Sequence, residues 1–436
     1  MKTLLRTGIL LSLATTASAA PNVTNIGQKG SLLIFPDVRV DTVLGNLVNA
    51  PTPLQTNGFN TLIRIQNDGN SDVTLKCFWL DGHKNRVDFV VPVGRTQASW
   101  FNAKTGGGSV NVNPFPTAAA NGFTAGNRHP FLEAGGAFAV PAPNQLGTTT
   151  TFPNGDGYGP YRRGALVCWV VDDGVQQQVK WNHLSGTATV YTDSASYEYN
   201  AYAFFVPTGT DLDPVGTAGT INLNGLEYDS CPLYQIGQFT PAVVNGAGYA
   251  ATFGATDIIP LNLQSPISVL WNRVAVTGCT LNLNQDWTPV WTKLQFDIWN
   301  GEEIKFTGAF ECADTWHETD FRPGTQAQNN GTVNVPGFVD GVDAAGQNFF
   351  FTTLATRAAR YRVQGIKSTQ CDRTKSGTDT VAAVTTQAVG IVAVQSSVVR
   401  FDAATDLIGT PLAAAGKANG KVVWDPSQTT PEGGVR

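Results

Sequence analysis

Short runs of β-branched and aromatic residues, each closed by a turn sequence, restrict this chain to an all-β fold. Four such runs lie at residues 31–40, 61–66, 73–80 and 87–93. Asn, Asp and Gly cluster between them, and these residues tolerate the positive φ of tight turns. Residues 189–202 alternate apolar or aromatic with small or polar side chains, which is the period of a half-buried strand.

The composition supports the same fold class. The chain holds 46 glycines and 24 prolines in 436 residues, which argues against helical bundles and coiled coils. Hydrophobic residues make up 42%, enough for buried cores, whereas charged residues make up only 14%. The net charge is −5 and the longest basic run is Arg162-Arg163, so we expect no nucleic-acid partner.

The second half of the chain resembles the first. Residues 61–69 form a strand followed by an Asn-Asp-Gly turn, and residues 293–301 form a strand followed by Asn-Gly. Each is followed by a strand that carries a cysteine, Cys77 or Cys312. The repeat predicts two immunoglobulin-like β-sandwich domains of about seven strands each, with long Gly/Pro/Asn-rich loop insertions.

The expected domains are 20–215 and 216–436. The first contains a long insertion over 104–163 that is rich in Gly, Pro, Asn and Thr. Loops of this length are usually functional or flexible. The boundary falls where the composition between 208 and 255 turns to Gly, Thr and Pro.

The first 19 residues have the pattern of a secretory signal peptide. Lys2 and Arg6 precede a short apolar run, and Ala17-Ser18-Ala19 is a cleavage site. The run is far below the roughly 20 residues that span a bilayer, and no later segment is long enough either. We therefore expect an exported protein without a transmembrane segment, either periplasmic or extracellular at the cell surface.

Six cysteines in an exported chain predict disulfides. They are Cys77, Cys168, Cys231, Cys279, Cys312 and Cys371. Cys77 and Cys168 lie near Trp79 and Trp169, so we pair them as a bridge between facing sheets of the first sandwich. Cys231 with Cys279 and Cys312 with Cys371 are the remaining pairs.

The densest polar cluster, Asp314, His317, Glu318 and Asp320, is a candidate metal or acid–base site. Strand alternation would send Thr315 and His317 to one face and Asp314, Trp316 and Glu318 to the other. The alternative is a solvated strand end. The chain lacks G-x-S-x-G and H-E-x-x-H, so a secreted hydrolase would have to use this cluster.

A second candidate site is the Gly-rich segment that ends in Tyr161, Arg162 and Arg163. Its backbone could cradle an anion and its arginines could hold a carboxylate or sulfate. Acidic residues such as Asp156 could contribute to a calcium site, although no known calcium loop is matched. Otherwise no cofactor is expected, and the alternative is a plain turn-rich loop.

Aromatic residues suggest a third site. Trp287 and Trp291 are separated by an even number of residues and could form a stacking surface for a sugar on one strand face. Pro289 between them weakens the case for a continuous strand. The alternative is that these rings, like Tyr197 and Tyr199, fill the core between two sheets.

Four segments carry a resemblance to known proteins. They are 30–36, 285–289, 305–310 and 362–371. Together they resemble a group of secreted bacterial proteins with two β-sandwich domains, to which no activity attaches. The resemblance implies a bacterial exported protein and no site residues.

These observations leave three expected functions. The first is an exported, non-enzymatic surface, matrix or filament protein, structural or adhesive, whose partner is itself or a surface glycan. The second is a glycan- or ligand-binding β-sandwich protein. The third is a secreted hydrolase. A fold alone assigns none of them.

Overall fold

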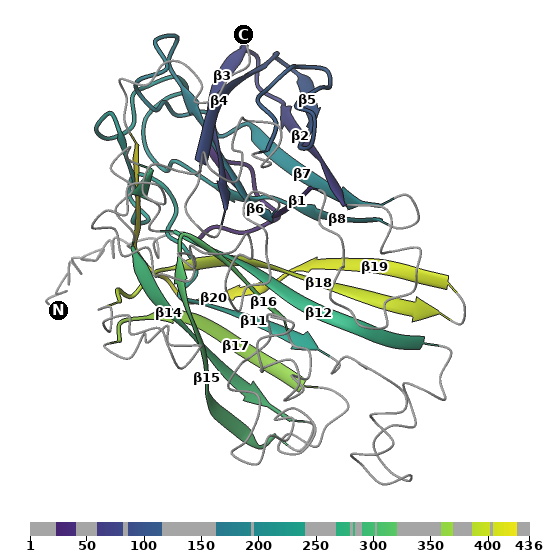
Figure 1. The fold of residues 1–436 in the computed structure, drawn as a ribbon. Helices are drawn as coiled ribbons and strands as arrows, with labels where there is room; N and C mark the ends of the chain where they lie inside the picture. Colours follow the sequence, from purple (N-terminus) through teal and green to yellow (C-terminus); the bar gives the residue numbers. More distant parts are fainter. Residues whose placement is uncertain are drawn as a thin grey trace, which may run out of the picture.

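The computed structural model of the chain is all-β over the residues that it describes (Figure 1). These residues are 23–40, 59–81, 86–115, 163–192, 196–239, 267–279, 282–283, 290–300, 303–320, 359–368, 386–401 and 404–424. The expected β-sandwich class is confirmed. Its immunoglobulin-like detail and the two domain boundaries stay predictions.

Nine strands build the first sandwich. Its five-stranded sheet has the order β4-β3-β6-β1-β9, formed by Arg86–Val93, Val73–Asp81, Arg163–Val171, Leu32–Arg39 and Tyr202–Phe204. Its four-stranded sheet has the order β5-β2-β7-β8, formed by Gln97–Asn102, Asn60–Asn67, Leu184–Tyr191 and Ser196–Asn200. All neighbouring strands are antiparallel.

Nine further strands build the second sandwich. The five-stranded sheet β15-β14-β17-β11-β20 comprises Lys305–Asp314, Trp291–Trp299, Ala359–Ile366, Tyr234–Phe239 and Ala413–Ala415. The four-stranded sheet β16-β12-β18-β19 comprises Trp316–Asp320, Ile267–Gly278, Ile391–Phe401 and Ala404–Pro411. The four-stranded sheet lies between the five-stranded sheet and the first sandwich (Figure 1).

The strand order of the first sandwich is repeated in the second. The five-stranded orders β4-β3-β6-β1-β9 and β15-β14-β17-β11-β20 match strand for strand, and so do the four-stranded orders β5-β2-β7-β8 and β16-β12-β18-β19. The corresponding strands also follow each other in the same order along the chain, from β1 and β11 to β9 and β20. The sequence motifs therefore indicate a real repeat, but the alignment that they suggest is wrong by one strand. They pair residues 61–69 with 293–301, whereas β2 corresponds to β12 and β14 corresponds to β3.

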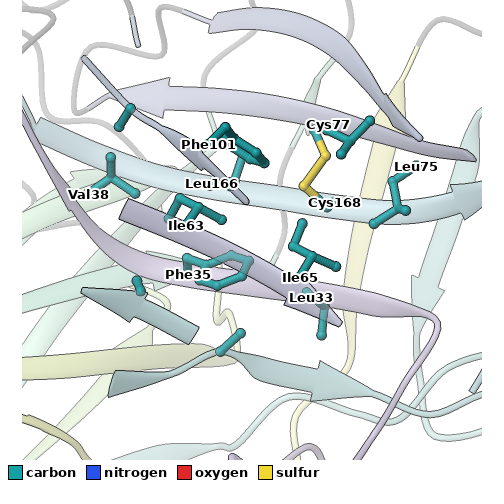
Figure 2. Packing of buried hydrophobic residues seen from close by; sticks show 14 of the residues in the cluster. Leu33, Phe35, Val38, Ile63, Ile65, Leu75, Cys77, Phe101, Leu166 and Cys168 are labelled. Carbon is teal, nitrogen blue, oxygen red and sulfur yellow. A yellow bond between two sulfur atoms is a disulfide. The ribbon is translucent and has the colours of Figure 1, made fainter. Parts of the chain in front are cut away.

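The first core lies between the two sheets of the first sandwich (Figure 2). Leu33 and Phe35 of β1 face Ile63 and Ile65 of β2. Each of these side chains has no solvent exposure, and full burial of one contributes about 1.5–3 kcal/mol. The alternation of buried and exposed residues along β2 is the pattern expected of a strand with one face in water.

Cys77 and Cys168 form a disulfide in this core, with their Cα atoms 4.1 Å apart. The expected pairing is therefore present, but the expected setting is wrong. Cys77 in β3 lies directly opposite Cys168 in β6 within one sheet, rather than on a facing sheet. A bridge of this kind typically adds about 2–4 kcal/mol of stability.

A second core covers the outer face of the first sandwich's five-stranded sheet. A small sheet of β10 (Thr220–Leu223), β21 (Gly420–Trp424) and β13 (Asn282–Leu283) packs there. The disulfide Cys231–Cys279 lies in the same core. Of the third expected pair, the Cys312 side chain and Cys371 lie outside the described part of the chain.

The two sandwiches also meet at the end of β1. The Trp316 indole, buried against Ala165 and Ala275, donates a hydrogen bond of 2.7 Å to the Pro36 carbonyl. Gly409 of β19 lies so close to Tyr197 of β8 that a Cβ atom would come within 2.0 Å of the ring. The sandwiches are therefore in direct contact through side chains and backbone.

Four buried charged residues, which we call the charge cluster, complete this contact. Arg39 of β1 places Nε 2.8 Å from Asp37 Oδ1 and Nη2 3.1 Å from Glu318 Oε2. Arg273 of β12 places Nε 3.2 Å from the other Glu318 oxygen. The cluster contains two cations and two anions, so its formal charges cancel.

Hydrogen bonds from both sandwiches surround the charge cluster. Tyr197 donates to the Asp37 carboxylate, and Arg39 Nη2 lies 3.2 Å from the Ser396 hydroxyl. Burial raises the pKa of Asp37 above its ordinary value, and the positive charge of Arg39 offsets only part of that rise. Such burial costs free energy unless the partners are in place, so the cluster favours one docking geometry.

Replacing Glu318 by Gln tests this contact. The substitution leaves Arg39 and Arg273 with one anion instead of two, so we expect the free energy of unfolding to fall by about 3–5 kcal/mol. Urea unfolding of the oxidised chain measures it. The matched control is Arg64→Gln, which removes an exposed pair with Glu198 at 3.6 Å and should cost less than about 1 kcal/mol. A Glu318→Gln loss as small as that of the control would contradict this role.

Candidate functional site

The residues predicted to bind a ligand are not brought together in the described part of the chain. Arg163 is the first residue of β6 and Trp291 the first residue of β14. They therefore belong to different sandwiches. The side chains of both, and all of Tyr161, Arg162 and Trp287, lie outside the described residues.

Of the residues in the predicted metal site, Glu318 lies inside the charge cluster. This carboxylate is fully buried and held by Arg39 and Arg273, so both of its oxygens already face cations. Sequence reasoning missed this because both arginines lie far away in the chain. Glu318 therefore has a role in the contact between the sandwiches, and the metal or acid–base role stays a prediction.

The strand alternation expected around this cluster holds from Trp316 to Glu318 but does not continue through Thr315. Thr315 has a φ of 44°, so the chain breaks there, and β15 and β16 join different sheets. Asp314 pairs with Trp291 in the five-stranded sheet, whereas Glu318 pairs with Ala275 in the four-stranded sheet. Over the described residues, no three His, Cys, Asp or Glu side chains, His317 included, are placed to hold a metal ion.

Aromatic side chains in the described part of the chain divide into buried rings and rings that reach the surface. Tyr197 and Tyr199 fill the first core, as the alternative interpretation held. Trp100 of β5 is 45% exposed, opposite Arg64 of β2. Trp299 of β14 lies on the outer face of the second sandwich, where Lys305 and Arg360 contact its ring.

Cationic and aromatic side chains gather on the outer face of the second sandwich's five-stranded sheet. We call this surface the basic face, and it consists of Tyr234, Asp297, Trp299, Lys305, Arg360 and Arg362. The residues come from four neighbouring strands, β15, β14, β17 and β11. Alternation places them there, because their neighbours Phe296, Ile298 and Tyr361 point into the third core.

Two cations flank Trp299. Lys305 of β15 and Arg360 of β17 are its partners on the two adjacent strands. The Lys305 ammonium lies 5.5 Å and the Arg360 guanidinium carbon 5.1 Å from the ring centroid. Each cation–π contact at an exposed site is worth about 0.5–1 kcal/mol. The indole therefore holds both cations in place on the sheet.

One carboxylate orders the next row of the basic face. Asp297, 2% exposed at its side chain, forms ion pairs with Arg362 and, at 3.2 Å, with Lys305. Burial opposes ionisation of Asp297, but hydrogen bonds from Arg362 and Lys305 outweigh it and lower the pKa of this carboxyl. Arg362 also lies over the Tyr234 ring at 5.3 Å.

The basic face carries a net positive charge in a negatively charged chain. Lys305, Arg360 and Arg362 against Asp297 give three cations and one anion, or +2, whereas the whole chain is −5. Lys305 remains 42% exposed at its side chain, and Arg360 is exposed as well. An anion in solution can therefore reach the cations.

The corresponding face of the first sandwich is apolar and covered. There, Phe78, Trp169 and Phe204 pack under β10 and β21 in the second core. The buried ion pair Lys76–Asp88 lies in the same sheet. The repeated sheet thus serves as an internal packing surface in one sandwich and as an exposed charged surface in the other.

Comparisons with known proteins do not assign this chain to a family. No protein-family model and no curated protein matches this chain. A crystal structure described as that of a "putative secreted protein from Parabacteroides distasonis" aligns with 9% identity over 91% of this chain and 96% of that chain. Its TM-score is 0.15, so neither fold nor function is transferred from it.

The location of the protein is supported in outline. Two disulfides are typical of an oxidising compartment outside the cytosol and indicate an exported protein. The predicted signal peptide lies outside the described residues and stays a prediction. Among the residues that the structure describes, no helix is long and apolar enough to cross a membrane.

The lowered pKa of Asp297 predicts a pH-dependent stability. A carboxyl whose pKa is lower in the folded state contributes stability above its unfolded pKa, near 3.8, and loses it as the pH falls through the folded value. Asp297→Asn should therefore be less stable than the natural chain at pH 7, and the difference should shrink below pH 4. Urea midpoints at pH 7 and pH 3 measure it. A difference that stays constant with pH would show that Asp297 does not act as a charge.

Proposed function

We propose that the chain is an exported, non-enzymatic adhesive protein that binds a surface glycan or related ligand through the basic face. The observation that carries the proposal is the Lys305–Trp299–Arg360 arrangement on an open sheet. Holding two exposed cationic side chains, Lys305 and Arg360, against the half-buried Trp299 ring costs side-chain entropy, and a surface ordered in this way is suited to binding. Binding through a rigid sheet also places its groups more accurately than a loop does.

The contact between the sandwiches supports the structural part of this proposal. A surface, matrix or filament protein has to transmit force between its ends without separating its parts. The charge cluster and the second core fix the sandwiches to each other with buried side chains. This favours a rigid body with a binding face at one side, rather than two independently moving modules.

The proposal is tested by binding of the oxidised chain to a panel of neutral and acidic polysaccharides, measured by biolayer interferometry. At least one polymer should bind, and Trp299→Ala should weaken that binding tenfold or more because Lys305 and Arg360 lose the ring that orders them. Trp100→Ala is the matched control and should bind normally, because that exposed ring lies on the first sandwich.

Two results would contradict the proposal. If no polymer in the panel binds the natural chain, the adhesive function is wrong. If Trp100→Ala weakens binding and Trp299→Ala does not, the binding surface is on the other sandwich. Circular dichroism of both variants excludes a loss of folding as the cause.

A further inference from the structure

We infer that the ligand of the basic face is an acidic polysaccharide, held through the carboxylates of its uronic acid units. The inference rests on the proposed function and names the class of ligand. Four observations lead to it: the stacking at Trp299, the donors left on Arg360, the modest charge of the face, and the amide side chains beside it.

The stacking at Trp299 argues against a neutral sugar. A sugar ring binds a tryptophan by covering the face of its indole. Here Lys305 and Arg360 lie over that ring from the two flanking strands. The indole is therefore already in contact with two cations, and the exposed groups beside it, Lys305 and Arg360, are positively charged.

The guanidinium of Arg360 has N–H donors available for a ligand. A cation–π contact with a ring does not use the N–H groups of a guanidinium as hydrogen-bond donors to an oxygen acceptor. Over the described residues, the contact of Arg360 is the Trp299 ring, and no carboxylate lies within ion-pair distance of it. A guanidinium fork matches the two oxygens of a carboxylate in a bidentate pair, which makes Arg360 the central anchor.

The charge of the face fits a polymer with widely spaced anions. Its net value is +2, and the exposed Glu303 lies in the turn directly before β15. A nucleic acid carries one negative charge per about 1.7 Å of duplex and requires a larger basic surface. Charge complementarity therefore favours a polysaccharide that carries at most one carboxylate on each sugar unit.

Amide side chains complete the surface. Gln295 and Gln364 pair across β14 and β17, one row beyond Asp297 and Arg362, and Gln238 pairs with Arg360. An amide offers both a donor and an acceptor, which suits the hydroxyl groups of a sugar. The face thus combines groups for a carboxylate with groups for hydroxyls.

The test compares polygalacturonate with the same polymer after full methyl esterification, which removes the charge and keeps the sugar. We expect the oxidised chain to bind polygalacturonate at least tenfold more tightly than the ester. Raising the salt from about 50 to 500 mM should weaken that binding strongly, because exposed charges are screened. The Arg360→Gln substitution should weaken binding of polygalacturonate about tenfold. The control substitution Arg64→Gln, at an exposed arginine of the first sandwich, should leave the binding affinity unchanged.

The remaining outcomes show whether the acidic ligand, the proposed function or both are wrong. Equal binding of the ester, lost in Trp299→Ala, would overturn the acidic ligand and keep a glycan-binding protein. Equal or tighter binding of single-stranded DNA or dextran sulfate would overturn the carboxylate assignment in favour of a general polyanion surface. No binding of any polymer would overturn both.

Discussion

The buried ion pairs of Arg39 with Asp37 and Glu318 determine how the rest of this molecule is arranged. Asp37 and Arg39 end β1, a strand with no exposed residue, and Glu318 belongs to the other sandwich. Charges without solvent are costly unless each meets its partner. The sandwiches therefore dock where Glu318 and Arg273 complete the cluster, and this docking turns the five-stranded sheet of the second sandwich away from the first.

The repeat explains why one sheet face is available for binding. Both sandwiches have the same strand order, so each builds the same five-stranded sheet. In the first, the outer face carries apolar residues and is covered by β10, β13 and β21. In the second, the equivalent face carries Lys305 and Arg360 beside Trp299 and Arg362 beside Asp297, and both Lys305 and Arg360 are exposed. The same backbone thus supports packing in one copy and, in our proposal, recognition in the other.

The sequence predicts local properties of this fold well and long-range ones poorly. Strand alternation, the all-β class and the partner of Cys77 follow from neighbouring residues. The sheet that holds Cys77 and Cys168 does not, because β3 and β6 are separated by the long insertion. The alignment of the repeat is displaced by one strand because β2 and β14 are both followed by a turn sequence that contains Asn and Gly. Glu318 resembles a metal ligand in the sequence because the arginines that hold it, Arg39 and Arg273, are distant in the chain. The residues of the basic face are spread over the chain from 234 to 362. The only local sign of this face is the alternation of charged residues at 360 and 362.

Differential scanning calorimetry of the oxidised chain tests the central claim, that the charge cluster and the second core join the sandwiches into one unit. The account predicts a single transition whose calorimetric and van't Hoff enthalpies agree, since neither sandwich unfolds without exposing the other. It also predicts that Glu318→Gln shifts the whole transition to lower temperature. Two separate transitions in the natural chain, both unchanged in Glu318→Gln, would contradict it.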